Sequence, residues 1–425
     1  MTSFDGAPPA RAWRASMAGR DRDEPHRAAT PLELLFDLCF VVAVAQAAAR
    51  LHHGLAVSHV GPALLGYAMV FFAIWWDWMN FTWFASAYDT DDVPYRLLTF
   101  LQITGVLVLA AGVPAAFDHY DFAAVTVGYV IMRVALVGQW SRAAWEDPAG
   151  RRTAVLYAVG IAAVQVGWLL RLALPDPWGG VGFAVLVLLE LAVPIWAERL
   201  GGPTSWHPEH IAERYSLFTL IVLGEVVLAA TIAVQTAAQD GLSASLLGLA
   251  GGGLLLVFGM WWTYFKRPAH GGLRASPGSA FLWGYGHYAV FAAVAALGAG
   301  LQVAVETTTH EAYLGPAAAA FAVAVPVAVF LVLVGALQTR LGNHRLWVRF
   351  TVAAIVIVGL GAAAVRLPMP VAIVGMGLTL AVLAALDVFD AHRQLRAARL
   401  AGMAGVEVLP ATPRLRHRTE SMRRT

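Results

Sequence analysis

Charged residues are scarce in this chain of 425 residues. Asp, Glu, Lys and Arg together make up 13% of it, whereas a soluble domain carries roughly 25%. Hydrophobic residues account for 59%, and the mean hydropathy is +0.65. This balance excludes an ordinary soluble globular protein. Apolar runs recur from residue 31 to residue 389, and each is about 20 residues long, enough to cross a hydrocarbon core of about 30 Å.

Several other features are missing. Cys39 is the only cysteine and Lys266 is the only lysine, so the chain has no disulfide framework and no thiol-based metal site. It contains no Walker loop, no dinucleotide-binding glycine pattern and no Gly-x-Ser-x-Gly elbow. We therefore expect no cofactor, no metal site and no nucleic-acid partner. The continuous apolar runs also exclude a membrane β-barrel, whose strands alternate in polarity over about 10 residues.

The runs predict an all-α fold, a polytopic membrane helix bundle of about 12 transmembrane helices. Two pairs of spans are separated by short breaks, at Asp118-His119 and at Arg366 to Pro368. The expected spans are Pro31–Leu51, Val60–Phe84, Tyr95–Phe117, Tyr120–Trp140, Thr153–Leu174, Gly180–Ala197, Glu209–Val234, Ser243–Phe265, Ser279–Val305, Tyr313–Leu337, Trp347–Val365 and Pro368–Phe389.

Basic residues are concentrated in an arm of residues 1–30, in a tail of residues 391–425 and in every second connection between spans. Cytoplasmic loops of membrane proteins carry an excess of Lys and Arg, so both termini are predicted to be cytoplasmic. The two terminal segments are expected to be solvated and flexible. The basic connections contain Arg96; Arg142, Arg151 and Arg152; Arg199; Lys266, Arg267 and Arg274; and Arg340, Arg345 and Arg349.

A weak internal repeat divides the chain near residues 201–203. Glu33 stands near the start of the first span as Glu213 does in the seventh, and Trp75-Trp76 near the end of the second span match Trp261-Trp262 in the eighth. We predict two parallel six-helix halves, residues 31–200 and 201–390, with any transport site at their interface. Aromatic belts at the membrane surface would explain the tryptophan-rich segments without a duplication.

Polar residues lie at a similar depth in five of the first six spans. Counting from the expected cytoplasmic end of each span, at about 1.5 Å per residue, places them roughly 9–12 Å below the surface. A carboxylate in hydrocarbon costs at least about 2.5–3.5 kcal/mol, so these groups should face protein or water and have partners. The layer consists of Asp37, Asp77, Gln102, Arg133 and Glu190.

We expect Arg133 to offset the acidic side chains of this layer, because a guanidinium stays charged and offers five donors. Three acids against one arginine leave an excess. A bound cation, a shared proton or a neutral carboxyl group can relieve it. Each of these is what an ion or proton pathway uses. The alternative is a static salt-bridge cluster that fixes the packing of the helices.

The second half contains fewer charges inside its spans. Glu225 lies near the expected bilayer midplane without a partner in its own helix, and it is the second candidate for a pathway. His287 suits a group that titrates near neutral pH, and a hydrogen-bonded structural role fits it equally well. The three-residue spacing of His207, His210 and Glu213 suits zinc ligands, but no further ligand follows and no metal site is predicted.

Three segments carry a resemblance to a known family. The first is Pro31–Val41, the second is Trp75-Trp76-Asp77, and the third is His210–Glu225. Together they resemble the hallmarks of the bacterial low temperature requirement protein A family, over about residues 30–389. The resemblance implies an integral protein of the bacterial cell membrane and brings no biochemical activity or substrate. The residues that match the family pattern are Glu33, Phe36, Asp37, His210, Glu213, Arg214 and Glu225.

Three functions fit this sequence. The leading hypothesis is a transporter-like or channel-like protein rather than an enzyme, with the lipid bilayer and a small ion, proton or solute as its partners. The second is a membrane-embedded enzyme for a lipid-linked substrate, which needs a cleft open to lipid near His210 and Glu213. The third is a non-catalytic scaffold or sensor, which predicts a closed and fully paired charged layer. The expected pathway residues are Asp37, Asp77, Gln102, Arg133, Glu190, Glu225 and His287.

Overall fold

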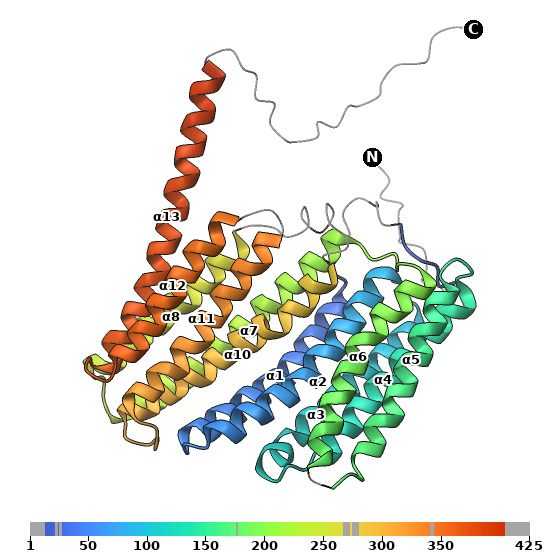
Figure 1. Ribbon diagram of the computed structural model, residues 1–425, viewed down its shortest axis with the longest axis horizontal. Coiled ribbons are helices and arrows are strands. Elements are labelled where there is room, and N and C mark those ends of the chain that lie inside the picture. Colours follow the sequence, from blue (N-terminus) through green and yellow to red (C-terminus); the bar gives the residue numbers. More distant parts are fainter. Residues whose placement is uncertain are drawn as a thin grey trace, which may run out of the picture.

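The computed structural model describes residues 13–21, 24, 28–175, 177–266, 273, 280–340 and 344–403. Within these residues the chain forms twelve long α-helices that lie side by side (Figure 1) and no strand, which confirms the predicted all-α fold. The helices are α1 (Pro31–Ala56), α2 (Val60–Ala87), α3 (Val93–Asp118), α4 (Ala123–Glu146), α5 (Arg151–Arg171), α6 (Trp178–Gly201), α7 (Pro208–Ala237), α8 (Ala244–Phe265), α10 (Ala280–Thr308), α11 (Pro316–Arg340), α12 (His344–Ala363) and α13 (Met369–Met403), with a short 3-10 helix at Ala238–Asp240.

Eleven of the described helices are long and apolar enough to span a membrane, and α12 is a shorter apolar helix over Trp347–Ala363. The two short breaks predicted from the sequence are confirmed. Helix α3 ends at Asp118 before α4 begins at Ala123, and α12 ends at Ala363 before α13 begins at Met369. The predicted bundle of about twelve membrane helices is therefore correct.

Helix α1 begins and α13 ends at the same end of the bundle, which we call the near end (Figure 1). The opposite end is the far end. Helix α13 has 35 residues, about 52 Å at 1.5 Å per residue, and it protrudes from the near end. Residues 391–403 of the predicted tail therefore continue α13 as a helix. The rest of the predicted tail, and the basic residues Arg267 and Arg274, lie outside the described residues.

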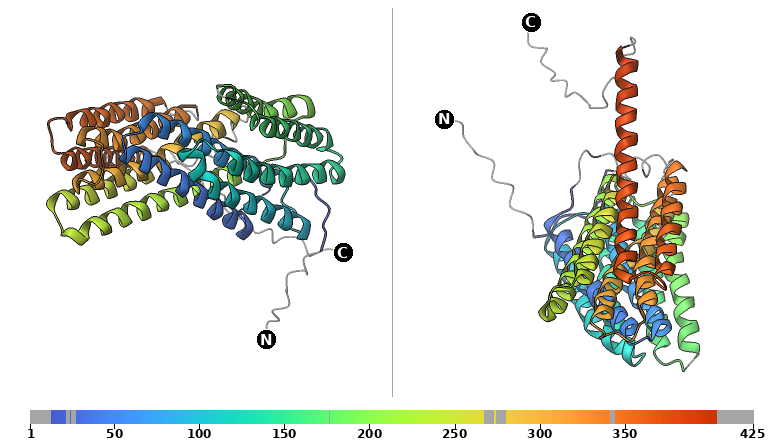
Figure 2. Two further views of the ribbon diagram at one scale, coloured as in Figure 1. Left: turned by 90° about the horizontal axis from the view of Figure 1, so that it is seen from below. Right: turned by 90° about the vertical axis from the view of Figure 1, so that its left-hand side faces the viewer.

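Helix α1 lies between two groups of helices, which sit side by side when the bundle is seen from below (Figure 2). It packs against α2 and α3 on one side and against α7 and α10 on the other. Helices α3 to α6 pack in chain order, as do α10 to α13, and α13 also packs on α8. This arrangement suits the predicted halves of residues 31–200 and 201–390, and the duplication itself stays a prediction.

Local sequence sets where three helices begin at the near end. The Thr30 hydroxyl accepts the N–H of Glu33, while the Glu33 carboxylate accepts the N–H of Thr30. This reciprocal capping box satisfies two backbone donors of α1. Asp92 caps α3 and His207 caps α7 through their side chains. These caps fix the residues at which α1, α3 and α7 begin.

The tryptophans of α2 do not form the expected interfacial belt. Trp75, Trp76 and Trp78 are at most 2% exposed, because α2 is enclosed by α1, α3, α4, α7 and α10. Trp261 of α8, in contrast, is 43% exposed and suits a position at the membrane surface. The aromatic residues of α2 therefore build the core of the protein, and an aromatic belt explains only the α8 segment.

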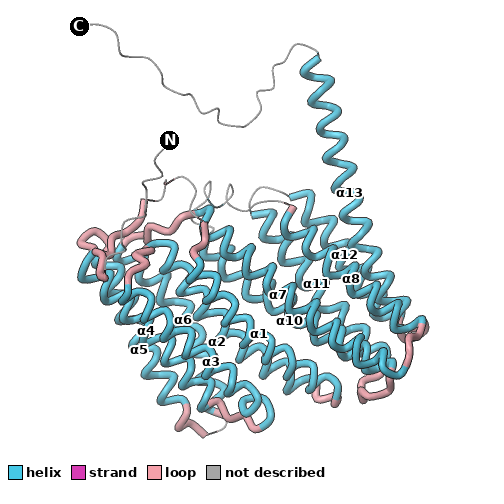
Figure 3. The backbone as a smooth tube through the Cα atoms, turned by 180° about the vertical axis from the view of Figure 1, so that it is seen from behind, coloured by secondary structure: helices cyan, strands magenta, loops and turns pink. Residues whose placement is uncertain are grey.

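Part of the N-terminal arm makes specific contacts with the bundle. Its residues 13–21 run across the loops at the near end (Figure 3), and we call them the strap. Met17 in the strap is fully buried. The N–H of Arg20 donates to the carbonyl of Ala87 at 3.0 Å, and the N–H of Ala15 donates to Asp92 at 2.9 Å. These contacts hold the strap against the bundle, while most of its residues are exposed, as expected of a solvated arm.

Asp92 is the main anchor of the strap. Arg142 donates to its two oxygens at 2.7 and 2.6 Å, alongside the N–H groups of Ala15 and Tyr95. Burial raises the pKa of Asp92, but these hydrogen bonds outweigh it and hold the pKa below its usual value. The folded protein therefore favours ionised Asp92. The resulting stabilisation is complete above the unfolded pKa of about 3.9 and is lost as the pH falls through the lower folded pKa.

We predict that Asp92→Asn loosens the strap at neutral pH, because an amide replaces a carboxylate whose charge-assisted hydrogen bonds are each worth about 1.5–3 kcal/mol. A spin label at Ser16→Cys, in a Cys39→Ala background, should report restricted motion at pH 7 and free motion in the Asp92→Asn variant. The label on otherwise native protein should gain mobility only below about pH 4. Asp121→Asn at the far end is the control, and equal mobility in both variants would contradict the assignment.

Candidate functional site

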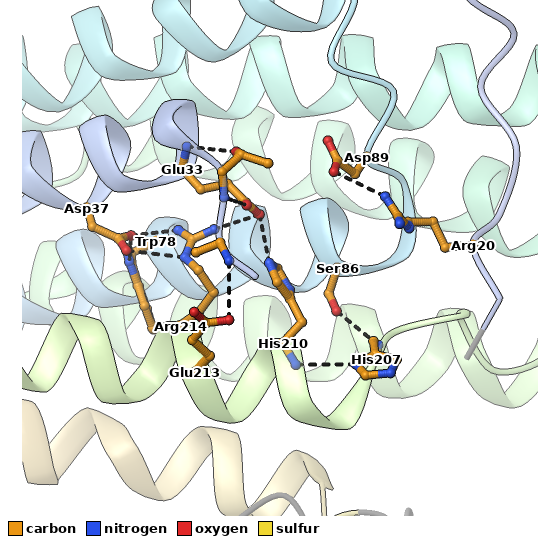
Figure 4. A network of polar contacts seen from close by, with 12 residues as sticks. Arg20, Glu33, Asp37, Trp78, Ser86, Asp89, His207, His210, Glu213 and Arg214 are labelled. Atoms are coloured by element: carbon orange, nitrogen blue, oxygen red, sulfur yellow. Dashed lines mark hydrogen bonds and ion pairs between the residues drawn. The ribbon is translucent and has the colours of Figure 1, made fainter. Parts of the chain in front are cut away.

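A buried arginine of α7 binds two acidic side chains of α1 (Figure 4). The NH2 group of Arg214 lies 2.6 Å from Asp37 Oδ1 and its Nε lies 3.2 Å from Oδ2, while NH1 lies 2.9 Å from Glu33 Oε1. Trp78 Nε1 donates to Asp37 at 2.7 Å. Arg214 and Asp37 are fully buried, and Glu33 is 1% exposed. We call Glu33, Asp37, His210 and Arg214 the Arg214 cluster.

Helix spacing explains this geometry. Glu33 and Asp37 are four residues apart on α1, and His210 and Arg214 are four residues apart on α7, so each pair shares one face of its helix. His210 Nε2 lies 3.1 Å from Glu33 Oε1. Beside the cluster, Glu213 accepts the N–H of Ala29 at 3.2 Å. These contacts tie α1 of the first half to α7 of the second.

This arrangement corrects one part of the predicted network. The sequence predicts that Arg133 offsets Asp37, whereas the structure pairs Asp37 with Arg214 on a helix of the other half. Counting depth along each span cannot reveal this pair, because depth does not say which helices are neighbours. The signal that would have found it is the matching four-residue spacing of charged and polar groups near the starts of α1 and α7.

A second cluster lies inside the first six helices. Arg133 of α4 forms an ion pair with Glu190 of α6, and its NH1 lies 3.6 Å from Asp77 Oδ1 of α2. All three side chains are fully buried, and we call them the Arg133 cluster. The depth count places these residues together, while their role in a pathway stays a prediction. Glu190 also accepts hydrogen bonds from Trp76 at 2.9 Å, Tyr129 at 2.8 Å, Gln165 at 3.0 Å and Trp168 at 3.1 Å.

Two of the predicted pathway residues are held by neutral groups. Gln102 donates to the side-chain oxygen of Gln139 at 2.9 Å. His287 lies 3.0 Å from the hydroxyl of Tyr264 and 2.7 Å from the carbonyl of Trp283. Both side chains are buried. The structure thus places Gln102 and His287 outside the two charge clusters, in positions that suit a structural role.

Glu225 lines a groove between α1, α7 and α10, on the far-end side of the Arg214 cluster. The groove has a volume of about 280 Å³. Glu225 is partly exposed in it, and Gln302 lies farther along the wall. Glu306 and Glu311 line the groove toward the far end, where Glu306 lies 2.8 Å from His52. The groove therefore carries three carboxyl groups and lies where the two predicted halves meet.

Aromatic side chains separate this groove from the Arg214 cluster. Phe218 lies one turn beyond Arg214 on α7, and its ring centre is 4.3 Å from Trp78 and 5.0 Å from Phe291. Phe218, Trp78 and Phe291 are fully buried. Glu225 lies about 17 Å from Arg214 along α7, at 1.5 Å per residue. Packed aromatic side chains of α2, α7 and α10 therefore lie between the groove and the Arg214 cluster.

An all-α bundle with eleven apolar spans and two buried charge clusters defines an integral, multi-pass membrane protein. The chain belongs to the bacterial low temperature requirement A (LtrA) family, whose sequence profile matches residues 28–386. This match confirms the resemblance, and its range includes both clusters and Glu225. The chain is also similar to an uncharacterized protein of Rhizobium meliloti (strain 1021), with 30% identity over 243 residues. The match covers 55% of this chain and 57% of that protein.

We predict that Arg214→Met destabilises the protein by about 3–5 kcal/mol, because it leaves two buried carboxyl groups without their guanidinium. Thermal unfolding of the detergent-solubilised protein measures the effect. The control is Arg199→Met, since Arg199 is exposed near the end of α6 and its replacement should change stability by less than about 0.5 kcal/mol. Equal unfolding temperatures for the two variants would rule out a structural role for the Arg214 cluster.

Proposed function

We propose that this protein transports a small cation or a proton across the membrane, with Glu225 as the innermost carboxyl group of the groove that binds it. The observation that carries the proposal is the groove at the junction of the predicted halves, with Glu225 near the expected bilayer midplane. A partly exposed carboxyl group at that depth is costly unless an aqueous cavity or a bound cation accompanies it. Parallel-repeat transporters bind their substrates at such a junction.

The charges of the groove favour a cation over an anion. Glu225, Glu306 and Glu311 line it together with the amide of Gln302. Several negative charges along a cleft concentrate cations and repel anions. Glu306 already contacts His52 at 2.8 Å, so the two carboxyl groups expected to meet a cation first are Glu311 at the mouth and Glu225 inside.

The rest of the proposed route is closed in this conformation. The aromatic residues around Phe218 fill the space beyond Glu225, and the Arg214 cluster lies one turn further. Alternating access requires one side to be closed while the other is open. We assign the groove to the open side. Asp37, Asp77, Arg133 and Glu190, all fully buried, belong to the closed side.

The arginine distribution supports a bacterial inner-membrane location with the near end in the cytoplasm. Arg14 and Arg20 lie in the strap, and three further arginines lie in the near-end turns of α3, α4 and α5, namely Arg96, Arg142 and Arg151. The groove would then open to the periplasmic side. A topology reporter fused after α12 and one fused after α13 should give opposite signals.

A scaffold or sensor is the second candidate, and the full burial of both charge clusters favours it. Static clusters would fix helix packing and would not need to open. The enzyme hypothesis has less support, because His210 is fully buried against Glu33 instead of facing a cleft open to lipid. Flux measurements separate the first two candidates, since a scaffold moves no ions.

We predict that purified protein in liposomes carries cation or proton current above that of protein-free liposomes, and that Glu225→Gln reduces it to the background. The amide keeps the shape of the side chain and removes the charge that binds the cation. Flux is read with dyes for pH, Na⁺ and K⁺. The control is Asp118→Asn, which removes a far-end carboxylate paired with Arg50 at 2.9 Å and should leave flux unchanged. Background flux with native protein would contradict transport and favour the scaffold.

A further inference from the structure

The two carboxyl groups beside Arg133 have opposite surroundings. Glu190 accepts hydrogen bonds from Arg133 and from four other side chains, those of Trp76, Tyr129, Gln165 and Trp168. Asp77 is fully buried, and neither of its oxygens accepts a hydrogen bond from any described residue. Its contact with Arg133 NH1 is 3.6 Å, which is too long for a hydrogen bond.

This contrast decides which acid carries the charge. An ionised carboxylate in an apolar interior needs both a counter-charge and hydrogen-bond donors. Glu190 has both, since it holds the guanidinium and four further donors. One guanidinium neutralises one carboxylate, so Asp77 is the acid in excess. Two carboxyl groups that share one guanidinium in an apolar interior cannot both be ionised at low cost.

The titratable and charged groups around Asp77 come from several helices. Helix α4 contributes Arg133 and Tyr129, and α6 contributes Glu190. Helix α10 contributes two tyrosines, packed on Trp75 and Trp76, and α3 contributes Tyr95, packed on Phe81. Asp37 of α1 and Arg214 of α7 bind each other on the side of α2 that carries Trp78, which donates to Asp37. The nearest cation therefore remains Arg133, which Glu190 already holds. The two tyrosines of α10 are Tyr285 and Tyr288.

A metal cation does not suit this position. It would lie beside the guanidinium of Arg133, 3.6 Å from Asp77, and like charges repel strongly in an apolar interior. The described residues also contain no group of three or more His, Cys, Asp or Glu side chains able to hold a metal ion. A proton neutralises Asp77 in place and needs no additional ligands.

We propose that Asp77 is a proton-binding site, occupied at neutral pH, so that its side chain is a neutral carboxylic acid beside an ionised Arg133–Glu190 pair. The inference stands without the transport proposal. If transport holds, Asp77 is a group on the closed side that can give up its proton only when the first six helices open.

Infrared spectroscopy of the full-length protein in detergent tests this at pH 7. Asp77→Asn should remove one protonated-carboxyl C=O band and leave the carboxylate bands unchanged. The control is Asp118→Asn, which should remove carboxylate intensity and leave the acid band, because Asp118 is an exposed acid paired with Arg50. Loss of carboxylate intensity in Asp77→Asn, without loss of an acid band, would overturn the proposal.

A second measurement avoids any risk that the variant misfolds. Native protein grown with aspartate carrying a ¹³C carboxyl group should show an acid C=O band shifted to lower frequency. The absence of a protonated aspartate band in the native protein would overturn the proposal without any substitution. The Asp77→Asn variant should also have the same unfolding temperature as the native protein, because Asn is close in shape and charge to protonated Asp. If Asp77 were ionised and paired, the same substitution should lower the unfolding temperature markedly. Transport activity enters neither readout.

Discussion

Hydrocarbon does not solvate charge, and this constraint organises the interior of the protein. Each deeply buried arginine lies where acidic side chains from other helices can reach it. Arg214 of α7 holds Asp37 of α1, and Arg133 of α4 holds Glu190 of α6. A buried pair adds little net stability over an apolar core, but removing one partner is very costly. The clusters therefore act mainly by fixing which helices are neighbours.

The two ends of the bundle differ because this constraint is met in different ways. At the near end, buried ion pairs, packed aromatic rings and the strap anchored by Asp92 close the protein. Toward the far end, Glu225 stands in a groove of about 280 Å³ instead of in a salt bridge. A carboxyl group at that depth needs water or a ligand as its partner, and this difference supports the proposed transport.

Both clusters contain two acids for each arginine, yet they have different means of relieving the excess. In the Arg214 cluster, His210 Nε2 lies 3.1 Å from Glu33 and gives this acid a second partner. The Arg133 cluster has no histidine among its described neighbours, and its hydrogen-bond donors all converge on Glu190. Asp77 is then the acid without a counter-charge, and it is neutralised by a bound proton. Similar charge counts thus lead to different protonation, because the donors are distributed differently.

The sequence by itself determined the membrane class, the number and breaks of the spans, and the shared depth of Asp77, Arg133 and Glu190. These follow from hydropathy, helix rise and bilayer thickness, which act along one helix at a time. Only the tertiary structure decided that Asp37 pairs with Arg214 and that the strap folds over the near end. Such contacts join residues far apart in the chain, and they depend on which helix faces meet, a packing outcome that no single span encodes.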